Sequence, residues 1–188
     1  MSRQGLTLSA LLAMALVVLP RMARAADAPL VRPVRDVDIT YKVPVSGGGD
    51  MAILQRLRFS ADLHRQRVDL PTSGNWMMID YVSRRMFLVR DSSREVVETP
   101  APETATLPNG GNAFVLVGPA RVDDLPCTEW RTHDTGGNET ITCYTDDGVL
   151  LRARSGDYVL MQAVNVTYAK QDAAVFTPPS GYTHQTRE

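Results

Sequence analysis

The sequence predicts a mostly β protein built on a single antiparallel sheet of about nine to eleven strands, with at most short helical turns. Two observations favour this fold class. Apolar and polar residues alternate with a period of two in many short segments, as they do in half-buried strands. Clusters of glycine, proline, asparagine and aspartate separate these segments at short intervals, and such clusters are typical of turns.

The first residues have the pattern of an export signal. Arg3 is followed by an apolar run of 14 residues, Leu6–Leu19, which is shorter than the roughly 20 residues that a membrane-spanning helix needs. Ala23-Arg24-Ala25 then has the pattern of a signal peptidase site. We therefore predict a signal peptide over residues 1–25 that is cleaved between Ala25 and Ala26. An uncleaved membrane anchor is the alternative interpretation.

The remaining chain is acidic and contains both cysteines. Removal of the predicted signal peptide takes away three arginines and leaves 17 basic against 21 acidic residues, a net charge of −4. This charge argues against a nucleic-acid binder, and no later segment is apolar enough to span a membrane. Two cysteines behind an export signal favour a disulfide in an oxidising compartment. We expect the periplasm, with an extracellular location as the second choice.

The mature chain of 163 residues suits one domain with its own core. We expect a flexible N-terminus at residues 26–33, a β domain at residues 34–182 with a Pro/Gly-rich loop at residues 99–112, and a polar tail at residues 183–188. The expected strands before the loop form an antiparallel meander: Val37–Val43, Met51–Ser60, Arg65–Leu70, Trp76–Val82, Met86–Arg90 and Glu95–Glu98. The expected elements after the loop are Ala113–Val117, a hairpin with both cysteines, Val149–Arg154, Tyr158–Tyr168 and a helical turn at Gln171–Phe176.

Both cysteines belong to this one predicted hairpin. If residues 134–136 form a three-residue loop whose glycine is left-handed, Cys127 faces Cys143 and Arg131 faces Glu139. A catalytic dithiol is the alternative, but such pairs usually have the spacing C-x-x-C at the start of a helix. Because the two cysteines are sixteen positions apart within strands, we predict a structural disulfide.

Three features together resemble a known family: the export signal, the antiparallel meander, and a late hairpin followed by a strand, a helical turn and the motif F-x-x-P-x-G-Y. The motif consists of Phe176, Pro179, Gly181 and Tyr182. From Val34 to Tyr182 the chain is similar to the periplasmic superfamily of the outer-membrane lipoprotein carrier. The resemblance implies a strongly curved sheet, an incomplete or half β-barrel, whose concave apolar face can hold an acyl chain. Helices close one side of the barrel in that superfamily, but this sequence has no amphipathic helical stretch that would form such a lid.

A set of methionine, aromatic and aliphatic residues is the candidate ligand face. Methionine adapts to irregular apolar ligands, and a curved sheet lined in this way would leave an apolar groove. The alternative is a filled core that other parts of the chain cover. The residues that we assign to this face are Met51, Ile53, Leu57, Phe59, Trp76, Met78, Met86 and Leu88.

Arginines at alternate positions are the candidate face for anions or partner proteins. Arg56, Arg58, Arg65 and Arg67 place their guanidinium groups on one face of two strands. If the turn between the strands has four residues, Arg58 faces Arg67, and two facing arginines repel unless an anion or a carboxylate lies between them. The alternative is a solvated outer face with ordinary ion pairs.

No catalytic constellation is recognisable. His64, His133 and His184 are far apart in the sequence, and no metal-binding, nucleophile-elbow or phosphate-loop spacing occurs. Asp80 is the one acid within a strongly apolar strand, and we expect it to pair with an arginine, with Arg85 and Arg90 as candidates. The sequence therefore predicts a protein without catalytic residues, metal or cofactor.

Two functions follow from these expectations. The first is non-enzymatic binding of a lipid, an acylated partner or another apolar molecule in the concave face. The second is a docking or sensor module of the cell envelope, which would bind a protein through the sheet edge and the arginine-rich face.

Overall fold

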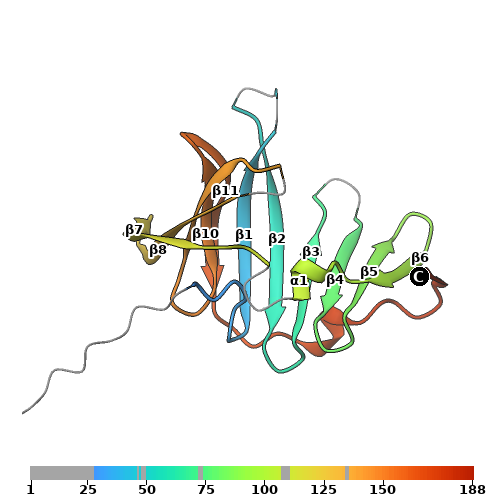
Figure 1. Cartoon of the computed structure of the whole chain (residues 1–188). Coiled ribbons are helices and arrows are strands. Elements are labelled where there is room, and N and C mark those ends of the chain that lie inside the picture. The colour runs from blue at the N-terminus through green and yellow to red at the C-terminus, as the bar shows by residue number, and fades with distance from the viewer. Residues whose placement is uncertain (1–27, 46, 48–49, 72–73, 107–110, 134–135) are drawn as a thin grey trace, which may run out of the picture.

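In the computed structural model, the chain forms one large open sheet (Figure 1). The structure describes residues 28–45, 47, 50–71, 74–106, 111–133 and 136–188. The elements in these residues are β1 (Val37–Pro44), β2 (Ala52–Ser60), β3 (Arg65–Asp69), β4 (Trp76–Asp80), β5 (Arg85–Arg90), β6 (Glu95–Pro100), α1 (Glu103–Thr106), β7 (Val115–Val122), β8 (Leu125–His133), β9 (Glu139–Tyr144), β10 (Leu150–Ser155), β11 (Tyr158–Thr167), the 3₁₀-helix η1 (Ala173–Phe176) and β12 (Thr183–Thr186).

The strands lie in the order β12-β6-β5-β4-β3-β2-β1-β11-β10-β9-β8-β7. The predicted single, mostly β sheet is confirmed, and β1–β6 form the predicted meander. The described residues contain twelve strands, however, and β12 runs parallel to β6, so the expected strand number and purely antiparallel pairing are wrong. The extra strand comes from the predicted polar tail. Its four side chains are all exposed, so it has no apolar alternation that the sequence could reveal. Backbone pairing with β6 holds this edge strand in the sheet.

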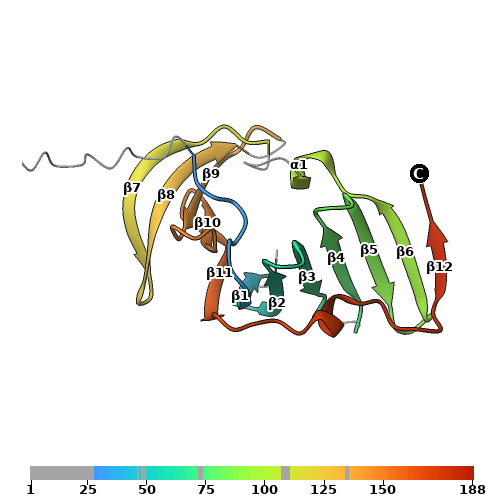
Figure 2. The same ribbon diagram turned by 90° about the horizontal axis from the view of Figure 1, so that it is seen from below.

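The sheet bends into an arch that stays open on one side (Figure 2). β6 and β7 lie near opposite edges, and α1, which belongs to the connection between them, lies on the open side of the arch. The predicted loop at residues 99–112 therefore contains the end of β6 and a short helix, while residues 107–110 lie outside the described residues. The connection from β11 to β12 carries η1 along the outer, convex side.

The main core lies on the concave face. Val37, Ile39 and Tyr41 of β1 are buried there, and the hydroxyl of Tyr41 donates a hydrogen bond of 2.8 Å to the carbonyl of Leu150. Burial raises the pKa of Tyr41, because the charged phenolate would lose its hydration. The other buried members of this core are Phe59, Val122, Cys127, Cys143, Val149, Leu151 and Ala163.

A smaller core lies on the convex face. Phe176 of η1 is fully buried there, and it packs on an apolar cluster that consists of Trp76, Met78, Val89 and Val96. The carboxylate of Asp172 caps η1 by accepting a hydrogen bond of 2.9 Å from the Ala174 amide. The helical turn that the sequence predicts at Gln171–Phe176 thus serves as the cover of the outer side of β4, β5 and β6.

The predicted disulfide is present. Cys127 and Cys143 are bonded, with their Cα atoms 5.5 Å apart. The predicted register is wrong by two residues, because Cys143 lies opposite Glu129, and His133 lies opposite Glu139. Five residues rather than three therefore separate the paired strands. The expected loop residues 134–135 lie outside the described residues.

The predicted signal peptide, including Ala25 and Ala26 at the expected cleavage point, also lies outside the described residues. Within the ranges that the structure describes, no helix has the length and apolar character to cross a membrane.

Candidate functional site

The eight apolar residues predicted to form one ligand face divide between the two faces of the sheet. Trp76 lies opposite Asp69 and Met78 lies opposite Arg67, and residues directly opposite each other point to the same face. Their assignment to the same face as the others is therefore wrong, because they share the convex face with the arginines. Met51 precedes β2 and is 63% exposed. The remaining five have concave-face positions: Ile53, Leu57, Phe59, Met86 and Leu88.

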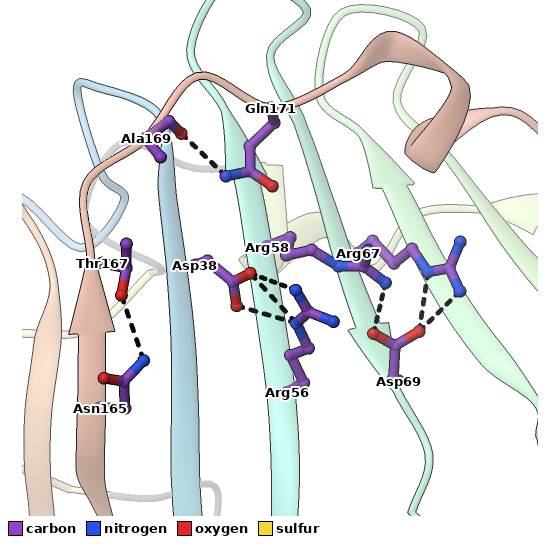
Figure 3. Close-up of polar contacts among 9 residues, drawn as sticks. All are labelled: Asp38, Arg56, Arg58, Arg67, Asp69, Asn165, Thr167, Ala169 and Gln171. Carbon is purple, nitrogen blue, oxygen red and sulfur yellow. Dashed lines mark hydrogen bonds and ion pairs between the residues drawn. The ribbon is translucent and has the colours of Figure 1, made fainter.

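The predicted facing of Arg58 with Arg67 is confirmed, and the carboxylate of Asp69 lies between the two guanidinium groups (Figure 3). Its oxygens lie 2.6 Å from Arg58 and 2.7 Å from Arg67. The other two arginines of this face are also paired, Arg56 with Asp38 at 2.5 Å and Arg65 with Asp80 at 2.8 Å. This face is therefore a network of internal ion pairs.

Arg67 also holds η1 against the sheet. Its guanidinium lies 3.9 Å from the centroid of the Trp76 ring, and its Nη1 donates a hydrogen bond of 2.8 Å to the carbonyl of Val175. Burial lowers the pKa of Arg67, and the hydrogen bond to Asp69 offsets only part of this effect. The contacts of Arg67 are those of a structural clamp.

Asp80 pairs with an arginine as expected, but the partner is Arg65 rather than Arg85 or Arg90. Those two pair with glutamates of β6 at 2.8 and 2.9 Å. The Asp80 Oδ1 also accepts hydrogen bonds from the amides of Val82 and Ser83. Burial opposes ionisation of Asp80, but the Ser83 and Arg65 hydrogen bonds outweigh it, so the pKa of Asp80 lies below its ordinary value. Asp80 is thus an ionised, structural residue.

A hollow of about 570 Å³ lies at one end of the concave face, between the N-terminal segment, defined as residues 28–34, and the turns after β2 and β4. We call it the strap pocket. Phe59 and Tyr81 form its apolar wall on the sheet side. Its full lining is Leu30, Val31, Arg32, Pro33, Val34, Phe59, Ala61, His64, Tyr81, Val82 and Arg84.

The N-terminal segment lies inside the arch (Figure 2), although we expected residues 26–33 to be flexible. Pro33 is buried, and the Val34 amide donates a hydrogen bond of 3.1 Å to the Asp147 carbonyl. Beside it, Arg35 forms an ion pair of 2.6 Å with Asp147. The segment also lines two smaller hollows, of about 330 and 170 Å³. It therefore divides the space inside the arch.

The pocket contains positive charge without a matching acid. Arg32 and Arg84 are part of its lining, and the lining contains no aspartate or glutamate. The guanidinium of Arg32 lies 4.7 Å from the centroid of the Tyr81 ring. Arg84 ends the turn after β4 in a left-handed conformation with φ of +55°, and its carbonyl accepts a hydrogen bond of 2.9 Å from the Ala101 amide.

Of the predicted apolar face, only Phe59 lines this pocket; Met86 and Leu88 do not. The N-terminal segment, Tyr81 and the two arginines were not among the residues predicted from the sequence. One signal that pointed to the segment is its composition, because Leu30, Val31 and Val34 are apolar although they precede the first strand.

The three histidines do not form a site. His64 lines the strap pocket, His133 ends β8 and His184 belongs to β12. Within the described part of the chain, no group of three or more histidine, cysteine or acidic residues is arranged to hold a metal ion.

No protein-family model matches the chain, and no curated protein sequence matches it. Among solved structures, the fold is similar to that of an uncharacterized conserved protein from Thermus thermophilus. That protein is 16% identical with a TM-score of 0.60, and the alignment covers 82% of this chain and 91% of that one.

The fold is also similar to part of PNGF-II, in crystals of space groups C2 and P21. The identities are 14% and 13% and the TM-scores 0.54 and 0.53, over 82% and 81% of this chain. The alignments cover 31% and 32% of PNGF-II, so this chain spans about a third of its length. At these identities the similarities show that the open sheet recurs in other proteins, and they show the fold alone.

Proposed function

We propose that the protein is a non-enzymatic, exported envelope protein that binds a lipid, an acylated partner or another apolar molecule in its concave face. The observation that carries this proposal is the strap pocket, a hollow of about 570 Å³ with an apolar wall formed by Phe59, Tyr81 and Val82. Pockets that bind small molecules usually enclose about 300–1,000 Å³ and are mostly apolar with a few polar groups.

The exposure of the pocket residues supports binding. Val82 is 72% exposed, Val34 is 59% exposed and Leu30 is 48% exposed, and all three line the same hollow. Contiguous exposed apolar surface is unusual in a protein unless it meets a ligand or a partner. An apolar ligand in the pocket would cover these side chains, with a gain of about 25 cal/mol for each Å² removed from water.

The resemblance to the superfamily of the outer-membrane lipoprotein carrier supports the same proposal. The curved, open sheet is the shape expected from it, and a disulfide fits the oxidising periplasm. In this chain the N-terminal segment lies inside the arch and α1 on its open side, whereas helices close one side of the barrel in that superfamily.

The test is binding of a neutral probe to the chain that begins at Ala26. A pyrene-labelled dodecanol reports entry into an apolar site by its fluorescence, and lipid mass spectrometry of protein purified from its host identifies a natural ligand. We expect binding that weakens in Val82→Asn, because a polar amide replaces an apolar wall. Val115→Asn is the matched control, since Val115 is 58% exposed and lies on β7, outside the pocket.

Ala61→Trp is a second variant that should weaken binding of the probe, because the larger side chain fills the hollow. Thermal unfolding of each variant reports whether it is folded. The proposal is overturned if neither this alcohol nor a pyrene-labelled fatty acid binds the folded chain and no apolar molecule co-purifies with it.

A docking or sensor module is the second candidate, and the edge strand β7 favours it. Val115, Leu116 and Val117 are 58%, 49% and 46% exposed on this edge, and edge strands of this kind accept an added strand from another protein. The arginine-rich face gives less support, because all four of its predicted residues pair with carboxylates.

The occupant of this edge would be an extended segment of one envelope protein. Capture of a single partner from a periplasmic extract, weakened by Val117→Lys and unchanged by Val164→Lys, would support docking at this edge. Val164 is the control because it is 48% exposed and lies on β11, which is not an edge strand. Equal capture by both variants would exclude docking at this edge.

A further inference from the structure

We infer that the ligand of the strap pocket is a single-chain amphiphile with an anionic end, and that Arg32 and Arg84 bind this end. The inference rests on the proposed function and adds the chemical class of the ligand. The observation that carries it is the charge of the pocket: its lining has two arginines and no aspartate or glutamate, whereas most arginines elsewhere in the described residues pair with a carboxylate.

Arginines elsewhere in the structure are mostly paired. Ten of the fifteen arginines within the described residues form an ion pair with a carboxylate. Arg32 and Arg84 form none with any described residue, and both line the same hollow. Two like charges beside one cavity repel each other unless an anion lies between them.

The backbones of both arginines are fixed. The Arg84 carbonyl is hydrogen-bonded to the Ala101 amide at 2.9 Å, and Asp80 holds the amides at the start of the turn that Arg84 ends. On the other side, the Arg32 carbonyl lies against Gly148, and its guanidinium lies over Tyr81. A site with fixed backbones loses less conformational entropy when an anion binds.

The lining sets the chemistry of the ligand. Guanidinium groups bind carboxylates and phosphate monoesters with paired N–H donors, while Phe59, Tyr81, Val82 and Leu30 offer apolar surface to a hydrocarbon chain. A neutral lipid leaves both guanidinium groups without an anionic partner, and a free anion leaves the apolar wall uncovered. A chain with one anionic end satisfies both parts of the lining.

The test compares two probes that differ only in the end group, pyrene-labelled dodecanoic acid and pyrene-labelled dodecanol, on the full chain from Ala26 at pH 7.5. We expect the acid to bind about ten- to a hundredfold more tightly, as hydrogen bonds to charged groups contribute. Added salt should reduce this preference, because it screens the charge. Hexadecanoic acid and hexadecyl phosphate then compete against the bound acid probe, and the stronger competitor identifies the carboxylate or the phosphate as the end group.

Arg84→Gln and Arg32→Gln should each lower the affinity for the acid and leave the affinity for the alcohol unchanged. Arg94→Gln is the matched control, because Arg94 has the same place in the turn after β5, with φ of +51°, and lies outside the pocket. Equal affinities for acid and alcohol overturn the inference and leave the proposed function standing. Failure of both probes to bind, with no apolar molecule co-purifying with the protein, overturns the proposed function itself.

Discussion

Gly148 packs directly against the backbone of Arg32. A Cβ atom on Gly148 would overlap the Arg32 carbonyl, and Gly148 has φ of +88°, a conformation that side chains disfavour. The preceding residue, Asp147, accepts the Val34 amide and forms an ion pair with Arg35. The turn between β9 and β10 is thus the anchor of the N-terminal segment, which forms one wall of the strap pocket.

The first prediction concerns this contact. Gly148→Ala should lower the free energy of unfolding by on the order of 1–3 kcal/mol or more, because backbone strain adds to the overlap with a carbonyl that is held in place. Gly137→Ala is the matched control, since Gly137 has φ of +81° and no atom within 4 Å of the added Cβ. Urea unfolding measures both variants. An equal loss of unfolding free energy in Gly148→Ala and Gly137→Ala would contradict the close packing of the N-terminal segment on this turn.

The second prediction concerns pH. The folded pKa of Asp80 lies below its ordinary value of 3.8, so the ionised carboxylate stabilises the fold above the unfolded pKa. This stabilisation is lost as the pH falls through the folded pKa. We expect the free energy of unfolding of the wild type to fall from about pH 4 downward. Asp80→Asn should be less stable at pH 7, and its free energy of unfolding should fall less steeply in acid.

Asp62→Asn is the control for Asp80→Asn, because Asp62 is exposed in the turn between β2 and β3. Urea unfolding at several pH values between 3 and 7 gives the two profiles. If Asp80→Asn keeps the acid slope of the wild type, the Arg65–Asp80 ion pair does not contribute to the pH dependence of stability.

The third prediction concerns the clamp under η1. Arg67→Lys should cost about 1–3 kcal/mol, because lysine cannot bond Asp69 and the Val175 carbonyl at once while it stacks on Trp76. Arg56→Lys should cost at most about 1 kcal/mol, since the Arg56 side chain is half exposed and pairs only with Asp38.

Chemical denaturation followed by tryptophan fluorescence measures both arginine variants. A change in the native fluorescence of Arg67→Lys is also expected, because the guanidinium leaves the face of the Trp76 ring. A similar loss of unfolding free energy in Arg67→Lys and Arg56→Lys would show that the packing of η1 on the sheet does not depend on Arg67.

The fourth prediction concerns the disulfide. The bond between Cys127 and Cys143 closes a loop with a sequence separation of 16 residues, and a loop of this size stabilises by about 3 kcal/mol in the chain-entropy model. A reducing agent should therefore lower Tm by about 6–12 °C for a chain of this length. The double variant Cys127→Ala/Cys143→Ala should unfold at a lower temperature and should not respond to the reductant. An unchanged Tm of the reduced wild type would show that the bond adds no stability.

Several local features were predictable because they depend on residues close together in the sequence. The alternation in β1 assigns Val37, Ile39 and Tyr41 to the core. The four-residue turn between β2 and β3 brings Arg58 opposite Arg67. The disulfide follows from one hairpin, although the turn has two more residues than expected and the register shifts with it.

The face of β4 could not be predicted in the same way. Trp76-Met77-Met78-Ile79 is apolar on both sides, so the period of two is invisible there. Side chains on both faces are buried, Ile79 on the concave face and Met78 on the convex face, where η1 with Phe176 covers it. The side to which Trp76 points depends on its register with β3, which pairs it with Asp69.

By itself, the sequence determined the fold class, the disulfide pair and the arginine-rich face, because strand alternation and short turns act over a few residues. Tertiary structure alone decided the partner of Asp80, the pairing of β12 with β6 and the strap pocket. The last two bring together segments that are distant in the chain, such as the N-terminal segment and the turn at Gly148, while Asp80 pairs with Arg65 across the neighbouring strands β3 and β4. No local pattern records such contacts, because shape and hydrogen bonding in the folded arch select them.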